Sequence, residues 1–168
     1  AMRRDHTVEE YIDLLTDLKS EVSDISLSTD IIVGFPGETD EAFQDTLNII
    51  GEVGYSSSYM FAYSPRPGTP ANELPDSVPE ETKKQRLQQL IDLQNHISEK
   101  KGLPYIGKNT EVLIEGRSSK PGYSFKGRNP QYWSVNIEEG EKSLQTGDIV
   151  QVKIEKVSGH SLQGRAII

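Results

Sequence analysis

The sequence changes its pattern at Gly102-Leu103-Pro104, and this change constrains the fold more than any other feature. Before it, segments with helical periodicity alternate with short aliphatic strands. After it, short strands are separated by glycine-containing turns. Gly102 and Pro104 are also typical of the end of the long helix that precedes them. The sequence therefore predicts two domains, residues 1–103 and residues 104–168.

The first domain is predicted to be an α/β unit. Helix and strand alternate at the spacing of a parallel sheet, either open or closed into a barrel. Capping boxes at Thr7–Glu10 and Ser77–Glu80 indicate the starts of its first and last helices. The segments are a helix with Val8, Tyr11, Ile12, Leu15, Leu18 and Val22 on one face, a strand at Ser26–Val33, a helix at Asp40–Val53, a strand at Ser57–Tyr63, and a helix to about Lys101 with Leu87, Leu90, Ile91, Gln94 and Ile97 on one side.

The second domain is predicted to be a small antiparallel β-barrel of about five strands. Barrels of this kind often hold oligonucleotides. The clearest strands are expected at residues 111–115, 133–137, 149–154 and 161–168.

Charge is distributed unevenly between the two domains. The chain carries 18 basic and 26 acidic residues, but residues 1–103 have a net charge of −10 and residues 104–168 a net charge of +2. This asymmetry indicates that the two domains have different partners. The absence of cysteine excludes disulfides, thiolate metal sites and cysteine nucleophiles within this chain. No signal peptide or membrane-spanning run is visible, so we expect a cytoplasmic protein that does not bind membranes.

The turn Gly34-Phe35-Pro36-Gly37-Glu38 follows the first predicted strand directly. Its glycines let backbone or ligand approach closely, and its proline stiffens the loop. The turn lies where α/β sheets bind ligands, at the carboxyl end of a strand and the start of a helix. It matches neither a Walker loop nor the dinucleotide fingerprint. Two interpretations stay open: a ligand site, or a tight turn in which Glu38 complements the helix dipole.

Several segments resemble the methylthiotransferases, radical S-adenosylmethionine enzymes that add a methylthio group to tRNA. The resemblance covers essentially the whole chain, and its last part is similar to the C-terminal RNA-binding TRAM domain of that family. The matching segments are Ser28–Thr39, Tyr63–Ala71, Arg86-Leu87, Leu93-Gln94, Gly107-Lys108, Val112–Gly116, Gly127-Arg128 and Leu162–Gly164.

This resemblance implies a fold and a cofactor site. The fold is the C-terminal part of a partial (β/α) TIM-like radical S-adenosylmethionine barrel, followed by an OB-like TRAM barrel. In the family, the Gly-Phe-Pro-Gly-Glu turn helps to shape the S-adenosylmethionine pocket, and an arginine near the first helix meets the cofactor carboxylate. The implied cofactor-binding residues are Arg4 (with Arg3 as the alternative), Gly34, Pro36, Gly37, Glu38, Tyr63, Ser64 and Arg66. For Arg66, an exposed structural loop is the other interpretation.

The chain departs from the family in lacking cluster ligands. The family holds one 4Fe-4S cluster by Cys-x3-Cys-x2-Cys on an early barrel strand and a second by cysteines of an N-terminal domain. This chain has no cysteine. We therefore expect a fragment without catalytic residues or metal, inactive alone, whose partners are the missing N-terminal part of the same protein and a tRNA anticodon arm.

The tRNA branches of the family fit better than the branch that modifies a ribosomal protein. Ser28-Thr29-Asp30 and Arg66-Pro67-Gly68-Thr69 favour tRNA. Phe61-Ala62-Tyr63 and the Leu87–Gln94 helix favour isopentenyladenosine over threonylcarbamoyladenosine as the substrate. A non-catalytic RNA-binding module is the alternative from a different class. In the barrel, basic residues are expected to contact phosphates, and aromatic residues are candidates for stacking on bases unless they belong to the core. The basic residues are Lys108, Arg117, Lys120, Lys126, Arg128 and Arg165, and the aromatic ones are Tyr123, Phe125, Tyr132 and Trp133.

Overall fold

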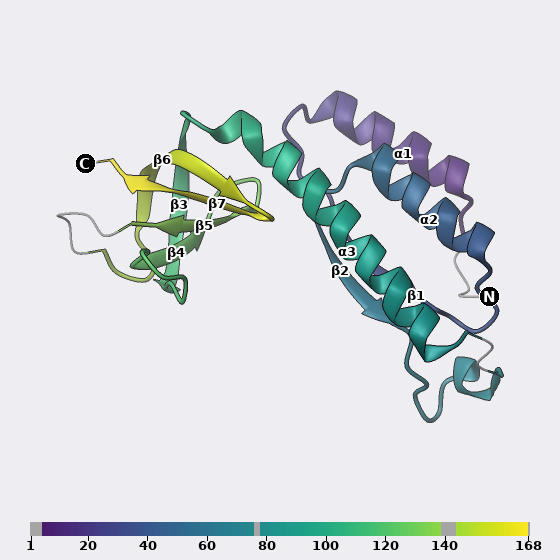
Figure 1. Ribbon diagram of the computed structural model, residues 1–168. Coiled ribbons are helices and arrows are strands. Elements are labelled where there is room, and N and C mark those ends of the chain that lie inside the picture. Colours follow the sequence, from purple (N-terminus) through teal and green to yellow (C-terminus); the bar gives the residue numbers. More distant parts are fainter. Residues whose placement is uncertain (1–4, 76–77, 139–143, 168) are drawn as a thin grey trace.

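A computed structural model describes residues 5–75, 78–138 and 144–167 of the chain. A helical α/β unit is joined to a β-barrel by one long helix (Figure 1). The α/β unit comprises α1 (Val8–Glu21), β1 (Ser28–Val33), α2 (Asp40–Val53), β2 (Ser57–Ala62), the short helix η1 (Pro70–Glu73) and α3 (Glu80–Gly102). The barrel part comprises the short helix η2 (Leu103–Tyr105), β3 (Asn109–Arg117), β4 (Phe125–Arg128), β5 (Ser134–Ile137), β6 (Ile149–Ser158) and β7 (Ser161–Ala166).

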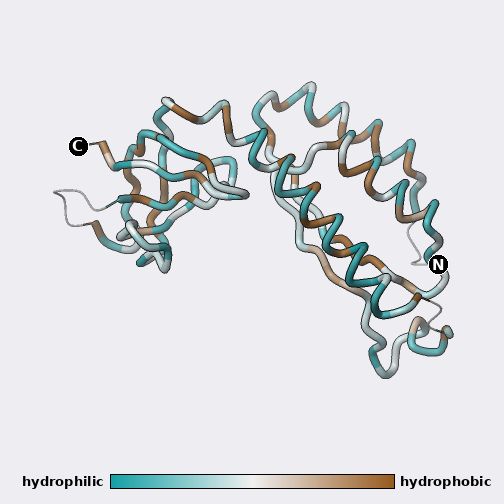
Figure 2. The backbone as a smooth tube through the Cα atoms, in the orientation of Figure 1, coloured by the Kyte–Doolittle hydropathy of each residue, from teal (hydrophilic) through white to brown (hydrophobic). Residues whose placement is uncertain are grey.

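In the α/β unit, β1 and β2 pair in parallel, with Ser28 opposite Ser57 and Val33 opposite Ala62. Burial alternates along both strands, so one face of the sheet packs against helices. The three long helices lie on that side (Figure 1). Hydrophobic and hydrophilic residues alternate along α1 and α2, as expected for helices with one buried face (Figure 2). The core there is formed by Leu15, Val33, Phe43, Ile50, Val53, Tyr55 and Leu90.

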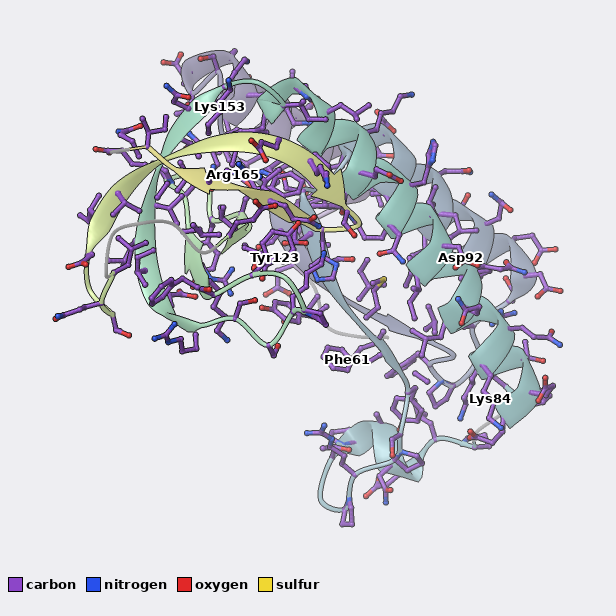
Figure 3. The ribbon with its side chains drawn as sticks, turned by 60° about the vertical axis from the view of Figure 1, so that its left-hand side comes forward. Phe61, Lys84, Asp92, Tyr123, Lys153 and Arg165 are labelled. Atoms are coloured by element: carbon purple, nitrogen blue, oxygen red, sulfur yellow. The ribbon has the colours of Figure 1, made fainter. Side chains whose placement is uncertain are left out.

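The opposite face of this sheet is open. Ile32, Tyr59 and Phe61 are 43%, 63% and 52% exposed on it. Phe61 points away from the helices (Figure 3). A large apolar and aromatic surface is therefore accessible beside the ends of both strands.

Two details of the predicted helices are corrected. Val8, Leu18 and Val22 are exposed, because a two-stranded sheet is too narrow to cover the whole apolar stripe of α1. The start of α3 is Glu80, with Pro79 as N-cap and no side-chain cap. Ser77, expected to cap this helix, lies outside the described residues. The Thr7–Glu10 capping box is confirmed, with both reciprocal bonds present.

The second half closes into a five-stranded barrel in the order β3-β4-β5-β7-β6. The predicted fold class, an α/β unit followed by a small β-barrel, is confirmed. One pairing departs from an antiparallel pattern, because β5 and β7 run parallel. The barrel encloses its own core, formed by Val112, Ile114, Trp133, Val135, Ile137, Leu144, Val152, Ile154 and Leu162.

Close contacts hold the barrel against the end of α3. A Cβ at Gly102 would lie 2.6 Å from Val157 Cγ1, so only glycine lets the helix approach β6 this closely. Gln131 Nε2 also donates to Asp24 Oδ2 at 2.7 Å. The barrel therefore lies at the amino ends of β1 and β2, whereas the Gly34–Glu38 turn lies at their carboxyl ends (Figure 1).

Candidate functional site

The turn after β1 needs its two glycines for its backbone shape. Gly34 and Gly37 have φ angles of 74° and 84°, in the left-handed region that side chains disfavour. The turn is closed by the Glu38 amide, which donates to the Phe35 carbonyl at 2.9 Å. A Cβ at Gly37 would meet no atom within 4 Å, so space remains open for another group to approach.

Helix α3 supports the turn through Lys83. A Cβ at Gly34 would lie 2.4 Å from Lys83 Cγ, so this lysine stem packs directly on the turn backbone. Lys83 is fully buried, and its Nζ lies 3.0 Å from Glu80 Oε1 and 5.6 Å from the centre of the Tyr63 ring. Gly34 thus serves a packing need as well as a conformational one.

Glu38 has a defined structural role in this turn. Its Oε2 accepts hydrogen bonds from the Gly34 amide at 2.7 Å and from Arg86 Nη1 at 2.6 Å. Arg86 Nη2 donates to Asp40 Oδ1 at 2.6 Å. Burial lowers the pKa of Arg86, but its hydrogen bonds to Asp40 and Glu38 outweigh burial and raise the pKa above its usual value. The carboxylate therefore ties the turn to α3, while the Thr39 hydroxyl caps α2.

Arg86 is a residue of this site that the sequence reasoning did not select. It is 6% exposed and lies one helical turn before the fully buried Leu90. The sequence signal that could have identified Arg86 is its position four residues before Leu90, on the buried face of the helix. A buried arginine requires an acidic partner.

The residues that follow β2 divide into two groups. Tyr63 lies beside the turn: its amide donates to the Val33 carbonyl at 2.8 Å, and its ring meets Phe35 edge-on at 5.2 Å. Ser64 and Arg66 are exposed, and neither side chain has a hydrogen-bonding partner among the described residues. Arg4 and Arg3 lie outside the described residues.

Three of the predicted RNA-contacting cations lie against aromatic rings. The guanidinium of Arg117 is 4.5 Å from the Phe125 ring, that of Arg128 is 4.2 Å from the Tyr132 ring, and Lys120 Nζ is 5.7 Å from the Tyr123 ring. Of the four aromatic candidates for base stacking, Trp133 is buried in the barrel core and Phe125 packs against that core. Tyr132, in contrast, is 71% exposed. Core packing thus accounts for Trp133.

The other cations differ in how far they are neutralised. Arg165 pairs with Glu138 at 2.7 Å and Glu155 at 3.7 Å, and its pKa is raised by the hydrogen bond and charge of Glu138. Lys108 and Lys126 are exposed and have no ion-pair partner within the described part of the chain.

Cross-strand register aligns four polar residues across β4, β5, β7 and β6. Only the lysines at the two ends of this row are exposed, because Asn136 is half-buried and Gln163 is buried. Lys126 of β4 lies opposite Asn136 of β5, which lies opposite Gln163 of β7, which lies opposite Lys156 of β6. The Tyr123 hydroxyl donates to Gln163 Oε1. We call this set of four residues the polar row. Beyond the Ile154–Gly164 pair, Lys153 of β6 lies opposite Arg165 of β7 (Figure 3). The sequence reasoning missed Lys153 and Lys156 because strand register is not visible in the sequence.

Comparison with known proteins identifies the barrel, because residues 104–167 match the TRAM domain family. The barrel is a TRAM domain. No helix among the described residues is long and apolar enough to cross a membrane. No group of His, Asp and Glu within the described ranges is arranged to hold a metal ion.

The whole chain, TRAM domain included, is similar to curated proteins named tRNA-2-methylthio-N(6)-dimethylallyladenosine synthase. The protein of Acetivibrio thermocellus is 46% identical over 99% of this chain, that of Halalkalibacterium halodurans 43% over 99%, and that of Pelotomaculum thermopropionicum 46% over 91%. The resemblance to the tRNA methylthiotransferases is confirmed. The chain spans only 34%, 30% and 34% of the lengths of these relatives. Among solved structures, the apo form of Mycoplasma genitalium RNase R aligns with 52% of this chain and 17% of that chain, at 13% identity and a TM-score of 0.35, too remote to support an argument.

Proposed function

We propose that this chain is part of a tRNA methylthiotransferase that acts on N6-isopentenyladenosine beside the anticodon. The observation that carries the proposal is 46% identity, over 99% of the chain, to a protein whose name specifies this modified base. Because the chain spans about a third of such relatives, the activity belongs to a larger protein to which this chain contributes two parts. A protein that modifies tRNA is expected to work in the cytoplasm.

The first part is one edge of an S-adenosylmethionine site. Gly34, Pro36 and Gly37 shape the turn and leave open space above Gly37, which fits a bound cofactor. Glu38 supports the cofactor indirectly, because its carboxylate is engaged by the Gly34 amide and Arg86. Tyr63, Ser64 and Arg66 border the same end of the sheet, and Arg4 stays a prediction. When bound, S-adenosylmethionine supplies the radical chemistry.

The 4Fe-4S clusters of the family do not fit the residues of this chain. Protein iron–sulfur clusters are held by cysteine thiolates, and the sequence contains no cysteine. The cluster ligands of the proposed enzyme must therefore come from another polypeptide segment.

The second part is the TRAM domain, which binds the anticodon arm of tRNA. Its sequence carries a net charge of +2 in a chain of net charge −8. The polar row presents two lysines without ion-pair partners among the described residues, as phosphate binding requires. Asn136 and Gln163 between them accept hydrogen bonds from the Ser118 and Tyr123 hydroxyls, so the two lysines are the groups of this row that are available to phosphate.

A chimera tests this function. The matching third of the Acetivibrio thermocellus enzyme is replaced by residues 1–168, and the chimera is expressed in bacteria that lack their own methylthiotransferase. Mass spectrometry of digested tRNA is expected to show the 2-methylthio derivative of isopentenyladenosine. A chimera that is folded and loaded with clusters but makes only the threonylcarbamoyl product, or none, contradicts the proposal.

A further inference from the structure

A cavity of about 620 Å³ lies between the α/β unit and the TRAM barrel. It is bordered by the amino end of β2, by the middle of α3 and by the Arg128–Ser134 segment of the barrel. This is the end of the sheet opposite to the Gly34–Glu38 turn, so the cavity is separate from the proposed cofactor site. Its volume lies in the range of small-molecule and cofactor pockets.

Two tyrosines with accessible rings border this cavity from opposite sides. Tyr59 of β2 is 63% exposed, and Tyr132 of the barrel is 71% exposed. The Arg128 guanidinium lies 4.2 Å from the Tyr132 ring. Its Nη1 donates to the Tyr132 carbonyl at 3.2 Å, and its Nε donates to Glu115 Oε1 at 3.2 Å on the barrel side. Flat aromatic surfaces beside a guanidinium are the groups on which bases of single-stranded nucleic acid stack.

Tyr132 is held in a conformation that its side chain disfavours. Its φ is 65°, and it has the only positive φ among the non-glycine residues that the structure describes. The buried Asn129 fixes this turn: its carbonyl accepts from the Tyr132 amide at 2.9 Å and its Oδ1 accepts from the Trp133 amide at 2.8 Å. Backbone conformations that cost free energy occur preferentially at binding sites, where they pre-position a side chain.

The polar groups of the cavity suit a nucleotide rather than a cation. None of the described lining residues is Asp or Glu, although the chain contains 26 acidic residues. Asn95, Ser57 and His160 line the cavity, and their side chains make no hydrogen bond within the described part of the chain. Amide, hydroxyl and imidazole groups of this kind pair with the edges of bases and with ribose hydroxyls.

We propose that this cavity binds an unpaired nucleotide of the RNA, with its base stacked on Tyr59 or Tyr132 and its phosphate near Arg128. The identity of the ligand as RNA rests on the proposed function. The site itself is additional to that function, because the cavity lies away from both the cofactor turn and the polar row. The cavity would hold a nucleotide beside the modified one rather than the reacting base.

Fluorescence of a modified base tests this site in the full 168-residue chain. The probe is a single-stranded RNA heptamer with 2-aminopurine at its centre, whose fluorescence is quenched when the base stacks. We expect quenching with the unmodified chain. Tyr59→Ala and Tyr132→Asn are each expected to weaken binding by about tenfold and to reduce quenching at saturation. Asn is chosen at position 132 because it tolerates a positive φ.

Two control variants separate the cavity from other effects. Phe61→Ala removes an equally exposed aromatic ring from the same strand, outside the cavity, and is expected to change neither affinity nor quenching. Lys126→Gln is expected to weaken binding but to leave quenching of the saturated complex intact. Unchanged far-ultraviolet circular dichroism and Trp133 fluorescence establish that each variant is folded.

The outcomes distinguish this site from the proposed function. RNA that binds without quenching, or with equal affinity to the tyrosine variants, overturns the nucleotide site while leaving the RNA-binding role of the TRAM domain standing. Quenching lost equally in Phe61→Ala also overturns the site, because the base would then stack on the open sheet. No RNA binding by the unmodified chain overturns both.

Discussion

Arg86 Nη1 lies 2.6 Å from Glu38 Oε2, joining the second turn of α3 to a loop residue 48 positions earlier in the chain. The two side chains are only 7% and 11% exposed, so each charge depends on the other for compensation. This pair, together with the Lys83 stem beneath Gly34, places the turn on α3. The shape of the proposed cofactor site is therefore determined partly by a helix that need not touch the cofactor.

Replacement of Arg86 by Met is expected to destabilise the α/β unit by about 3 kcal/mol, because it leaves the Glu38 carboxylate buried without a cation. Urea unfolding measured by circular dichroism at 222 nm follows the helices. The single tryptophan, Trp133, is in the barrel and reports the barrel separately. We expect the unfolding transition at 222 nm to shift to lower urea and the transition reported by Trp133 to stay in place.

Arg66→Gln is the matched control, because Arg66 is exposed and its side chain has no described partner. If Arg86→Met is no less stable than Arg66→Gln, the ion pair does not hold the turn. Adding Glu38→Gln to Arg86→Met is expected to recover part of the lost stability, since no uncompensated carboxylate then remains at position 38.

The two glycines of the turn are expected to differ in their response to alanine. Gly37→Ala places a side chain at a positive φ in open space, at a cost of about 1 kcal/mol. Gly34→Ala carries the same backbone cost and also displaces the Lys83 stem, which adds about 1–3 kcal/mol. Thermal unfolding followed by circular dichroism compares them, and equal costs would show that Lys83 does not pack on the turn in solution.

The α/β unit is expected to lose stability above pH 10. Burial, and then the hydrogen bond with Tyr11 at 2.7 Å, raise the pKa of Tyr55. The unfolded chain ionises this tyrosine at about pH 10, whereas the folded chain keeps it neutral. Stability from this group is thus complete below pH 10 and is lost as the pH rises.

Comparison with Tyr55→Phe isolates this contribution. The variant loses the hydrogen bond to Tyr11 at every pH, but its free energy of unfolding is expected to fall less steeply between pH 9 and pH 11. Urea titrations at fixed pH, followed at 222 nm, provide the measurement. Parallel pH profiles for the two chains would contradict the assignment to Tyr55.

The polar row is expected to set the salt dependence of RNA binding. Replacing Lys126 and Lys156 together by Gln should lower affinity for a tRNA anticodon stem-loop and flatten the plot of log K against log salt by about 1.5 units, because two phosphate contacts are lost. Lys84→Gln serves as the control, since Lys84 lies on α3 far from the barrel (Figure 3). An unchanged slope in the double variant would show that the row is only a solvated surface.

The sequence predicted the elements of this fold better than their side-chain partners. Periodicity and capping chemistry are local, so the helix at Asp40–Val53 and the Thr7–Glu10 box were predicted correctly. The role of Arg86 was missed because its partners are 46 and 48 residues away. The polar row was missed because it depends on the parallel β5–β7 register and on the irregularity between Ile154 and Lys156.

The length of α3 has a consequence for what the two ends of this molecule bind. The turn packs on Lys83 and the barrel on Gly102, 19 residues further along α3, so at 1.5 Å per residue the helix separates the Gly34–Glu38 turn from the TRAM barrel by about 29 Å. A single nucleotide is much shorter than this distance, so no mononucleotide contacts both ends. Only a ligand several nucleotides long spans them at once, which makes the length of the RNA, and not only its sequence, a condition for simultaneous contact.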